Sequence, residues 1–390
     1  MNASLDPAAF AAFCAPVSAR DFIDLLLRTG FSAEAYRDHY DDFTPLNWGP
    51  TQALRHLFNH GLNERRAIPM TLDRDALVAL ARLPIADTGF KSKLLTGLAR
   101  YLFADLGHPY GPAIVERWQV VRDLVRQGAR PYFITGDSHS HHLNLTGARG
   151  TEWLLPIHLL CTAGSATGLG NPVSRSGYGS LLRDAIRTIQ TLPDEEEIPF
   201  LFQFGQVDIE FVHHFRRVRD GGRALDLETY GMFCDATATR YIDFVADVFD
   251  LPRRKRVFVA SVFPPALSDA AWKQGYVNDD IARRETDMSV EALSAGIREL
   301  EIANFRQRTE IHLRFNARLK AACELLGFGF LDVATGFLGA DGLPDPLYIS
   351  PERQGFEHHL DARQTYTGLL KPIWQALDVT GLPVGLGTTS

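Results

Sequence analysis

The chain is poor in cysteine, in long apolar runs and in clustered positive charge. Only four of its 390 residues are cysteines, and no two of them form a Cys-x-x-Cys pair, so we expect neither a disulfide framework nor a zinc site. No run of about 18 apolar residues and no basic segment leading into an apolar one is found, which predicts no membrane span and a cytoplasmic location. The formal net charge of −7 argues against a nucleic-acid partner.

The remaining composition is ordinary for a globular protein, with 45% hydrophobic and 22% charged residues. At this length two domains are expected. Residues 1–125 show mixed helical periodicity without strand alternation, which predicts a small helical domain. Over residues 126–390 short apolar runs alternate with helical stretches, the pattern of a parallel α/β sheet.

Five apolar runs predict a parallel five-stranded sheet in a flavodoxin-like three-layer sandwich. Ligands bind such folds at the carboxyl ends of the strands, where Ser138, Gly164 and Gly205 would lie. Residues 266–305 are long for a connection and predict a lid or a helical insertion near that edge. The five runs are Pro131–Thr135, Trp153–Leu160, Pro199–Phe204, Arg256–Val262 and Phe328–Val333.

Gly136-Asp137-Ser138 follows the first of these runs. A serine at the end of a parallel strand would expose its hydroxyl beside the amides of the next turn, which can stabilise negative charge, so Ser138 is the candidate nucleophile. The loop 163–172 follows the second run. Its small residues would let a backbone amide of Gly164 or Gly168 approach a substrate oxygen closely.

A histidine-containing segment, 356–361, lies near the end of the sequence. Together with Ser138 and the loop 163–172, it makes residues 130–375 resemble an SGNH (GDSL-type) hydrolase or acyltransferase domain. That family has serine in its first block, glycine in the second, asparagine in the third and histidine in a last Asp-x-x-His block. Loop 163–172 resembles the string Gly-Ala-Thr-Ala-x-Gly-Leu-x-Asn-Pro of one bacterial branch. The resemblance implies Ser138 as nucleophile, an oxyanion hole made by the Ser138 amide with Gly164 or Gly168, and no cofactor or metal.

The third block departs from the family pattern. Val207 stands where the family has asparagine, and a valine side chain cannot donate to an oxyanion. The amide of the neighbouring Gln206 is the candidate replacement donor. The same bacterial branch often has Gly-Glu-Val-Asp here, so the valine is compatible with an active enzyme. Asp208 is more suited to anchoring a loop than to reacting.

The last block also departs from the pattern. His359 best matches the family histidine and His358 is second, but no aspartate lies three residues before either. Glu357 is the nearest acid, with Glu352 and Asp345 as alternatives. A Ser–His dyad, with the histidine held by a backbone carbonyl, is the remaining possibility.

Further histidines gather at the same edge of the predicted sheet, so a metal hydrolase is an alternative. Against it, the side chains of 138–142 would splay around the start of a helix, and no carboxylate stands at a familiar metal spacing. His139, Asp137, Asp208 and Asn171 are candidate substrate-binding residues in a polar groove.

A stretch within residues 31–69 resembles a short module of bacterial surface-polysaccharide proteins. The module has a tyrosine-containing helix followed by His-x-x-x-x-Gly-x-x-Glu-x-Arg-x-x-Pro, an ending supplied here by His56–Gly61, Glu64, Arg66 and Pro69. The alternative is a small helical packing unit without chemistry.

The sequence therefore predicts a serine-dependent esterase or O-acyltransferase, acting on a small-molecule or polysaccharide acyl ester. Carbohydrate enters by analogy with the N-terminal module. The alternatives are a non-catalytic carbohydrate-binding or assembly protein on a degenerate SGNH scaffold, and a metal-dependent hydrolase. The acyl group, the acceptor and the oligomeric state do not follow from the sequence.

Overall fold

The computed structural model describes residues 7–30, 32–38, 48–62, 74–104, 113–350 and 355–379. The chain forms two compact units. One runs to Tyr132 and includes Leu145–His158, and the other holds Phe133–Asn144 and the chain from Leu159 to its last helix. This division interleaves the two units around the first strands, whereas the sequence predicted a single cut between residues 125 and 126. Whether either unit is an independent domain stays a prediction.

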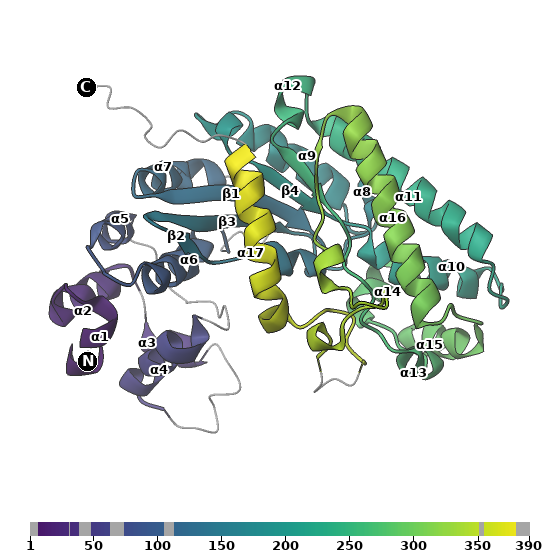
Figure 1. Ribbon diagram of the computed structural model, residues 1–390, viewed down its shortest axis with the longest axis horizontal. Coiled ribbons are helices and arrows are strands. Elements are labelled where there is room, and N and C mark those ends of the chain that lie inside the picture. The colour runs from purple at the N-terminus through teal and green to yellow at the C-terminus, as the bar shows by residue number, and fades with distance from the viewer. Residues whose placement is uncertain are drawn as a thin grey trace. The chain divides into compact units, whose positions relative to one another are not determined.

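The N-terminal part of the first unit is built from helices (Figure 1). Their side chains include a cluster of aromatic rings. Phe58 lies at its centre, with ring centroids 5.4 Å from Phe10 and 5.6 Å from Phe90. Phe22 presents its side chain from the buried stripe of an amphipathic helix to the same cluster. The helices are α1 (Ala11–Cys14), α2 (Ala19–Arg28), α3 (Ala33–Asp38), α4 (Pro50–His56), α5 (Arg74–Arg82), α6 (Thr88–Ala104) and α7 (Ala113–Val125).

The described part of residues 31–69 makes an internal contact. Tyr36 of α3 is fully buried, and its hydroxyl lies 3.1 Å from Nδ1 of His56 at the end of α4. A π-helical turn, Leu57–Gly61, continues α4, and a Cβ at Gly61 would collide with the Tyr36 hydroxyl. These contacts give the tyrosine, the histidine and the glycine a packing role. Glu64, Arg66 and Pro69 lie outside the described residues.

The sheet has six strands, in the order β2-β3-β1-β4-β5-β6. β1–β4, β4–β5 and β5–β6 are parallel pairs, and β2 is antiparallel to β3. The predicted purely parallel five-stranded sheet is therefore wrong: a two-residue strand, too short to show an apolar pattern, makes the sheet mixed. The strands are β1 (Ala129–Gly136), β2 (Ala148–Arg149), β3 (Glu152–Leu160), β4 (Phe200–Gln203), β5 (Val257–Ala260) and β6 (Gly329–Leu331).

The position of β1 in the sheet decides where a ligand can bind. All eight of its residues are buried, as expected for a strand covered on both faces. The amides of Trp153 and Cys161 donate to the carbonyls of Gly128 and Gly136, a constant offset that makes β3 parallel to β1. Apart from β2, the order is then the 2-1-3-4-5 order of doubly wound sheets, in which the crevice opens between the loops that follow β1 and β4.

Helices follow each of the later strands, and α11 and α16 run side by side (Figure 1). Residues 266–305, predicted as a lid or insertion, contain α13, α14 and α15. The helices are α8 (Ala166–Leu169), α9 (Tyr178–Ile189), α10 (His213–Arg219), α11 (Leu227–Val248), α12 (Leu251–Arg254), α13 (Asp269–Lys273), α14 (Asp279–Glu285), α15 (Val290–Glu299), α16 (Phe305–Leu326) and α17 (Ala362–Val379).

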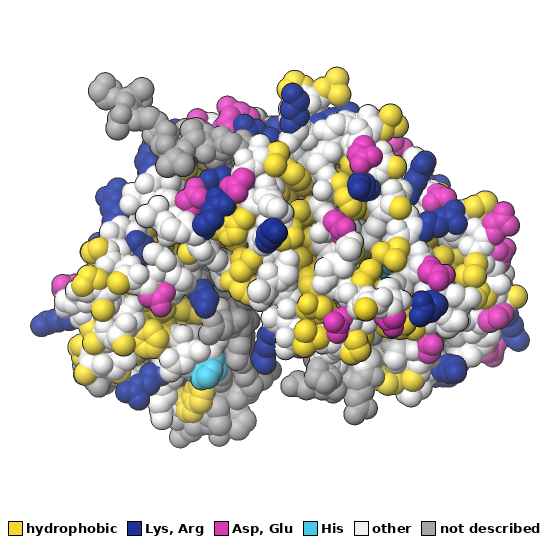
Figure 2. Space-filling model, viewed as in Figure 1, with side chains coloured by type: hydrophobic (Ala, Val, Ile, Leu, Met, Phe, Trp, Pro, Cys, Tyr) yellow, Lys and Arg dark blue, Asp and Glu magenta, His cyan; other side chains and the backbone are white. Residues whose placement is uncertain are grey.

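The surface carries charges of both signs. On the face shown in Figure 2, basic and acidic side chains are interspersed, and neither sign gathers into a broad patch. Across the described part of the chain, none of the helices combines the length and the apolar character needed to cross a bilayer.

Candidate active site

Ser138 stands where β1 ends and a 3-10 helix, Ser138–Leu143, begins. Asp137 caps that helix, because its side chain accepts from the His139 amide at 2.8 Å. Gly136 permits the turn: a Cβ there would collide with the carbonyl oxygen of Gln203 on β4. The turn leaves Ser138 half-buried while its neighbours Asp137 and His139 are buried.

Ser138 belongs to a continuous chain of three polar side chains. Its Oγ lies 2.8 Å from Nε2 of His359, and Nδ1 of the same ring lies 2.8 Å from Oε1 of Glu357. A His359 ring that carries its proton on Nδ1 satisfies both contacts. It donates a hydrogen bond to the carboxylate through Nδ1 and accepts one from the Ser138 hydroxyl at Nε2. This is the hydrogen-bond pattern of a Ser–His–acid triad.

Glu357 thus occupies the place of the missing aspartate. It lies two residues before His359 instead of three, and it also accepts from the His359 amide at 3.2 Å. The His359 side chain, more than any other group, lowers the pKa of Glu357 to about 2. The carboxyl is therefore ionised at neutral pH. Of the two alternative acids, Asp345 caps the start of a short 3-10 helix, and Glu352 lies outside the described residues.

His358 makes a different set of contacts. Its Nδ1 lies 3.0 Å from the hydroxyl of Tyr276, in the segment between α13 and α14. It is 4% exposed, and burial followed by the neighbouring His359 and His139 lowers its pKa to about 2, so the ring is neutral. Segment 266–305 therefore contacts the loop 355–361, here called the histidine loop, and holds His358, the residue beside His359.

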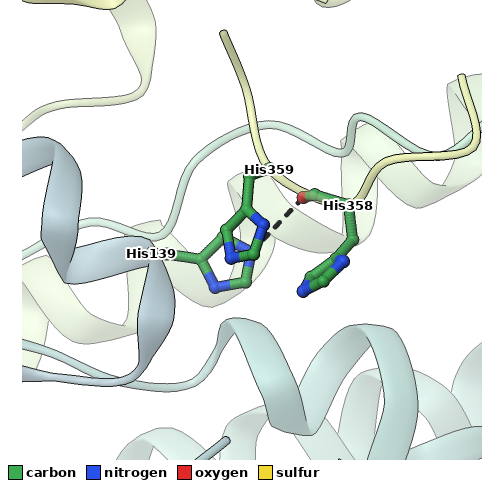
Figure 3. Close-up of side chains that lie close together, drawn as sticks. All are labelled: His139, His358 and His359. Atoms are coloured by element: carbon green, nitrogen blue, oxygen red, sulfur yellow. Dashed lines mark hydrogen bonds between the residues drawn. The ribbon is translucent and has the colours of Figure 1, made fainter. Parts of the chain in front are cut away.

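His139 also holds the histidine loop and lies away from solvent. It is 1% exposed, its Nδ1 lies 2.8 Å from Oδ1 of Asp137, and its Nε2 donates to the carbonyl oxygen of His358 at 3.3 Å (Figure 3). Burial raises the pKa of Asp137 to about 7 and lowers that of His139 well below its ordinary value. Both predicted substrate-binding residues thus have partners inside the protein.

Among the described residues, His139, His358 and His359 form a group of three potential metal ligands (Figure 3). Their nearest ring nitrogens lie within 4.8 Å of one another. However, both nitrogens of His139 and of His359 already have hydrogen-bonding partners, and so does Nδ1 of His358. A metal ion would have to displace these bonds, so the donor set fits a hydrogen-bonded triad better than a metal centre.

The predicted oxyanion donors Gly164, Gly168 and Gln206 already donate hydrogen bonds to groups inside the protein. The Gly164 amide donates to Cys161 at 2.8 Å, and the Gly168 amide donates to the Ser165 hydroxyl at 3.1 Å. Gln206 is buried, with its Nε2 donating to Glu210 and its Oε1 accepting from Phe263, both at 2.8 Å. The prediction that Gln206 replaces the family asparagine is therefore not supported by its contacts.

The loop offers another amide in place of these. Ala163 has a φ of 56°, a left-handed conformation that favours glycine. In the string that loop 163–172 resembles, Ala163 stands at the position of the leading glycine, but the sequence reasoning considered only the amides of Gly164 and Gly168. Within the described part of the chain, the amides of Ser138 and Ala163 have no hydrogen-bond acceptor.

Asp208 anchors that loop. Its carboxyl accepts from the amides of Ala166 and Thr167 and from the Thr167 hydroxyl, at 2.6, 3.0 and 2.7 Å. The side chain is fully buried, so it cannot contact substrate as predicted. Asn171 is exposed, and its side chain accepts from the Val173 amide at 3.1 Å.

Val207, the departure in the third block, is core. It is fully buried in an apolar cluster with Ala163, Phe211 and Leu267, on which Phe356 of the histidine loop packs. The helix of this region begins at Gln206, just after Gly205 with a φ of 111°. The third block therefore supports the site by packing.

No protein-family model and no curated protein matches the chain. Among solved structures, the crystal structure of an extracellular lipase from Streptomyces rimosus matches with a TM-score of 0.31 and 14% sequence identity. The match covers 63% of this chain and 99% of that chain. A TM-score this low carries no argument about function, so any assignment depends on the geometry of the Ser138 site.

Proposed function

We propose that the protein is a serine-dependent carboxylic ester hydrolase or O-acyltransferase of the SGNH type, with a three-layer α/β arrangement around its sheet. The observation that carries the proposal is the chain from Ser138 Oγ through the His359 imidazole to Glu357. It begins at the carboxyl end of β1, beside the crevice of a doubly wound sheet.

In this proposal His359 is the general base. It takes the proton of Ser138 through Nε2 as Oγ attacks the acyl carbonyl carbon, and it returns the proton to the leaving alkoxide when the C–O bond breaks. The acyl group then resides on Ser138. Water, or a sugar hydroxyl in a transferase, gives its proton to His359 and attacks the acyl carbon. The bond from that carbon to Ser138 Oγ then breaks, and His359 returns the proton to Oγ as the acid or the new ester leaves. Glu357 fixes the tautomer and stabilises the imidazolium.

The amides of Ser138 and Ala163 are our candidates for the oxyanion hole. Two donors aimed at the developing charge are enough for a working hole, and removing one such donor costs about a hundredfold to a thousandfold in rate. The third-block asparagine is then dispensable in this chain. A carbohydrate or glycoconjugate substrate is proposed by analogy with the N-terminal module, whose described part shows packing contacts.

The test is turnover of p-nitrophenyl acetate together with labelling by a fluorophosphonate probe. Wild type should turn over the ester and label, whereas Ser138→Ala should do neither. His359→Ala should lose at least about a hundredfold in rate. His141→Ala is the matched control, since His141 is exposed on the same short helix.

The same experiment separates the alternatives. Labelling that survives Ser138→Ala contradicts the nucleophile assignment. Absence of both turnover and labelling in wild type favours a binding scaffold. Loss of turnover on dialysis against a chelator, restored by zinc, would favour a metal hydrolase using the three histidines.

A further inference from the structure

A separate pocket of about 280 Å³ lies beside the Ala163 loop. Thr167 and Gly168 of that loop form part of its wall, and the rest comes from the segment 171–175 that follows them and from α10, α11 and α14 with adjoining residues. Its volume is close to the lower end of ligand-binding pockets. Neither Ser138 nor His359 lines it, so the pocket is distinct from the candidate triad.

The pocket is lined by five arginines and a single acidic residue, Glu285. Two of the five arginines have carboxylate partners: Arg175 pairs with Asp287, and Arg219 pairs with Asp220. The other three form no ion pair within the described part of the chain. These unpaired arginines are Arg216, Arg240 and Arg284.

Two of the unpaired guanidinium groups are held in place by aromatic rings. The Arg216 guanidinium lies 5.2 Å from the ring centroid of Phe233, and that of Arg284 lies 5.2 Å from the ring centroid of Tyr178. Such stacking fixes the plane of the fork while leaving its N–H donors available. A planar, fixed guanidinium is the group that proteins use for bidentate contacts with carboxylate and phosphate.

The pocket is connected to the Ser138 site through one loop. Ala163 lies at one end of this loop, and the pocket residues Thr167 and Gly168 follow it within a few residues. Asp208 fixes the segment between them by accepting from two amides and a hydroxyl. An ester whose carbonyl sits at the Ala163 amide could therefore place a neighbouring group in the pocket.

We propose that this arginine pocket binds an anionic group, a carboxylate or a phosphate, on the substrate of the acyl reaction. The role of the pocket in binding a substrate rests on the proposed function, whereas the binding of an anion does not depend on it. Three unpaired guanidinium groups face one carboxyl, so the charge balance favours an anion. The substrate class is then an acyl ester of an acidic or phosphorylated sugar.

The first experiment measures binding without any reaction. Inorganic phosphate is titrated into wild type, into an Arg240→Gln/Arg284→Gln double variant and into Arg283→Gln by calorimetry. Arg283 is the matched control, because it is exposed on the same helix, pairs with Asp279 and does not line the pocket. The double variant should bind at least about tenfold more weakly, and the control should match wild type. Equal binding by all three overturns the proposal.

The second experiment separates the two sources of the anion. Turnover is compared for acetylated glucose, acetylated glucuronic acid and acetylated glucose 6-phosphate. Wild type should prefer one anionic ester, and the double variant should lose that preference about tenfold while its rate on the neutral ester is unchanged. Turnover of all three esters with no preference removed by the variant overturns the pocket assignment. Phosphate binding without turnover of any ester retains the pocket and contradicts the proposed function.

Discussion

The Nε2 atom of His139 donates to the main-chain carbonyl of His358, across 219 residues of sequence. The residue that follows the nucleophile therefore holds the backbone that precedes the base. This bond fixes the spacing between Ser138 and His359 from a buried position. His139 is thus a positioning residue, although the sequence suggested that it would contact substrate.

Replacing His139 by phenylalanine should lower kcat for p-nitrophenyl acetate about tenfold to a hundredfold with little change in KM. The His358 carbonyl loses its donor, and displacement of a catalytic loop by about 1 Å costs up to a hundredfold. His139→Gln keeps a side-chain N–H and should recover part of the rate. Equal loss in both variants, or a rise in KM alone, would contradict the positioning role.

Replacing Glu357 by glutamine should reduce kcat by about a hundredfold or more, because the imidazolium loses its stabilising charge. Stability should respond to pH as well. The pKa of Glu357 is lowered to about 2 in the folded protein, so its contribution is complete above about 4.5 and is lost as the pH falls toward 2. Urea unfolding from pH 6 to pH 3 should show wild type and Glu357→Gln converging. Glu310→Gln, at an exposed acid, should track wild type throughout.

Restoring the family asparagine should not improve the enzyme. Val207→Asn places an amide in a fully buried apolar cluster, where an unsatisfied polar group costs about 1–3 kcal/mol. We expect urea unfolding to show that loss, with no gain in kcat/KM. Val173→Asn, at a site that is 83% exposed, should leave stability unchanged. A more active Val207→Asn would mean that the third block reaches the oxyanion after all.

Anion binding in the arginine pocket should weaken as the pH rises. Burial, aided by the charge of Asp208, raises the pKa of Glu285 to about 7, while a hydrogen bond from Ser165 and the charges of Arg216 and Arg175 oppose the shift. Below that pH the carboxyl is neutral, and above it the carboxylate competes with the ligand. Sulfate, which stays a dianion, should bind more weakly at pH 8 than at pH 6. Glu285→Gln should bind with the same affinity at both values, and an unchanged pH dependence in that variant would contradict this role of Glu285.

The parts of the fold that depend on local pattern were predictable. The runs that became β1, β3, β4, β5 and β6 are short and apolar, and all of them except β6 are mostly or fully buried, so such runs are recognisable without neighbours. The position of Ser138 was predictable from these runs, because the carboxyl ends of parallel strands lie at the same edge of the sheet and Ser138 follows the first run. β2 was missed, because two residues have no periodicity and pair only through the register of β3.

The parts of the site that depend on side-chain direction were not predictable. Gln206 was proposed because its amide stands next to Val207 in the sequence, but the chain turns at Gly205 and enters a helix, and the amide contacts Glu210 and Phe263. Glu357 was identified only as the nearest acid. Its reach to Nδ1 of His359 depends on a loop conformation that a two-residue spacing does not specify.

The left-handed alanine at 163 has a consequence for how the loop could change. A left-handed alanine costs roughly 1 kcal/mol relative to glycine at the same φ, whereas glycine has more conformations to lose when the chain folds. Alanine therefore strains the backbone of the folded loop, but it also reduces the number of conformations that the loop can adopt before folding. Glycine at 163 would relax the backbone and widen that range. Compared with glycine, the natural alanine therefore raises the conformational energy of the native state and lowers the conformational entropy of the unfolded state.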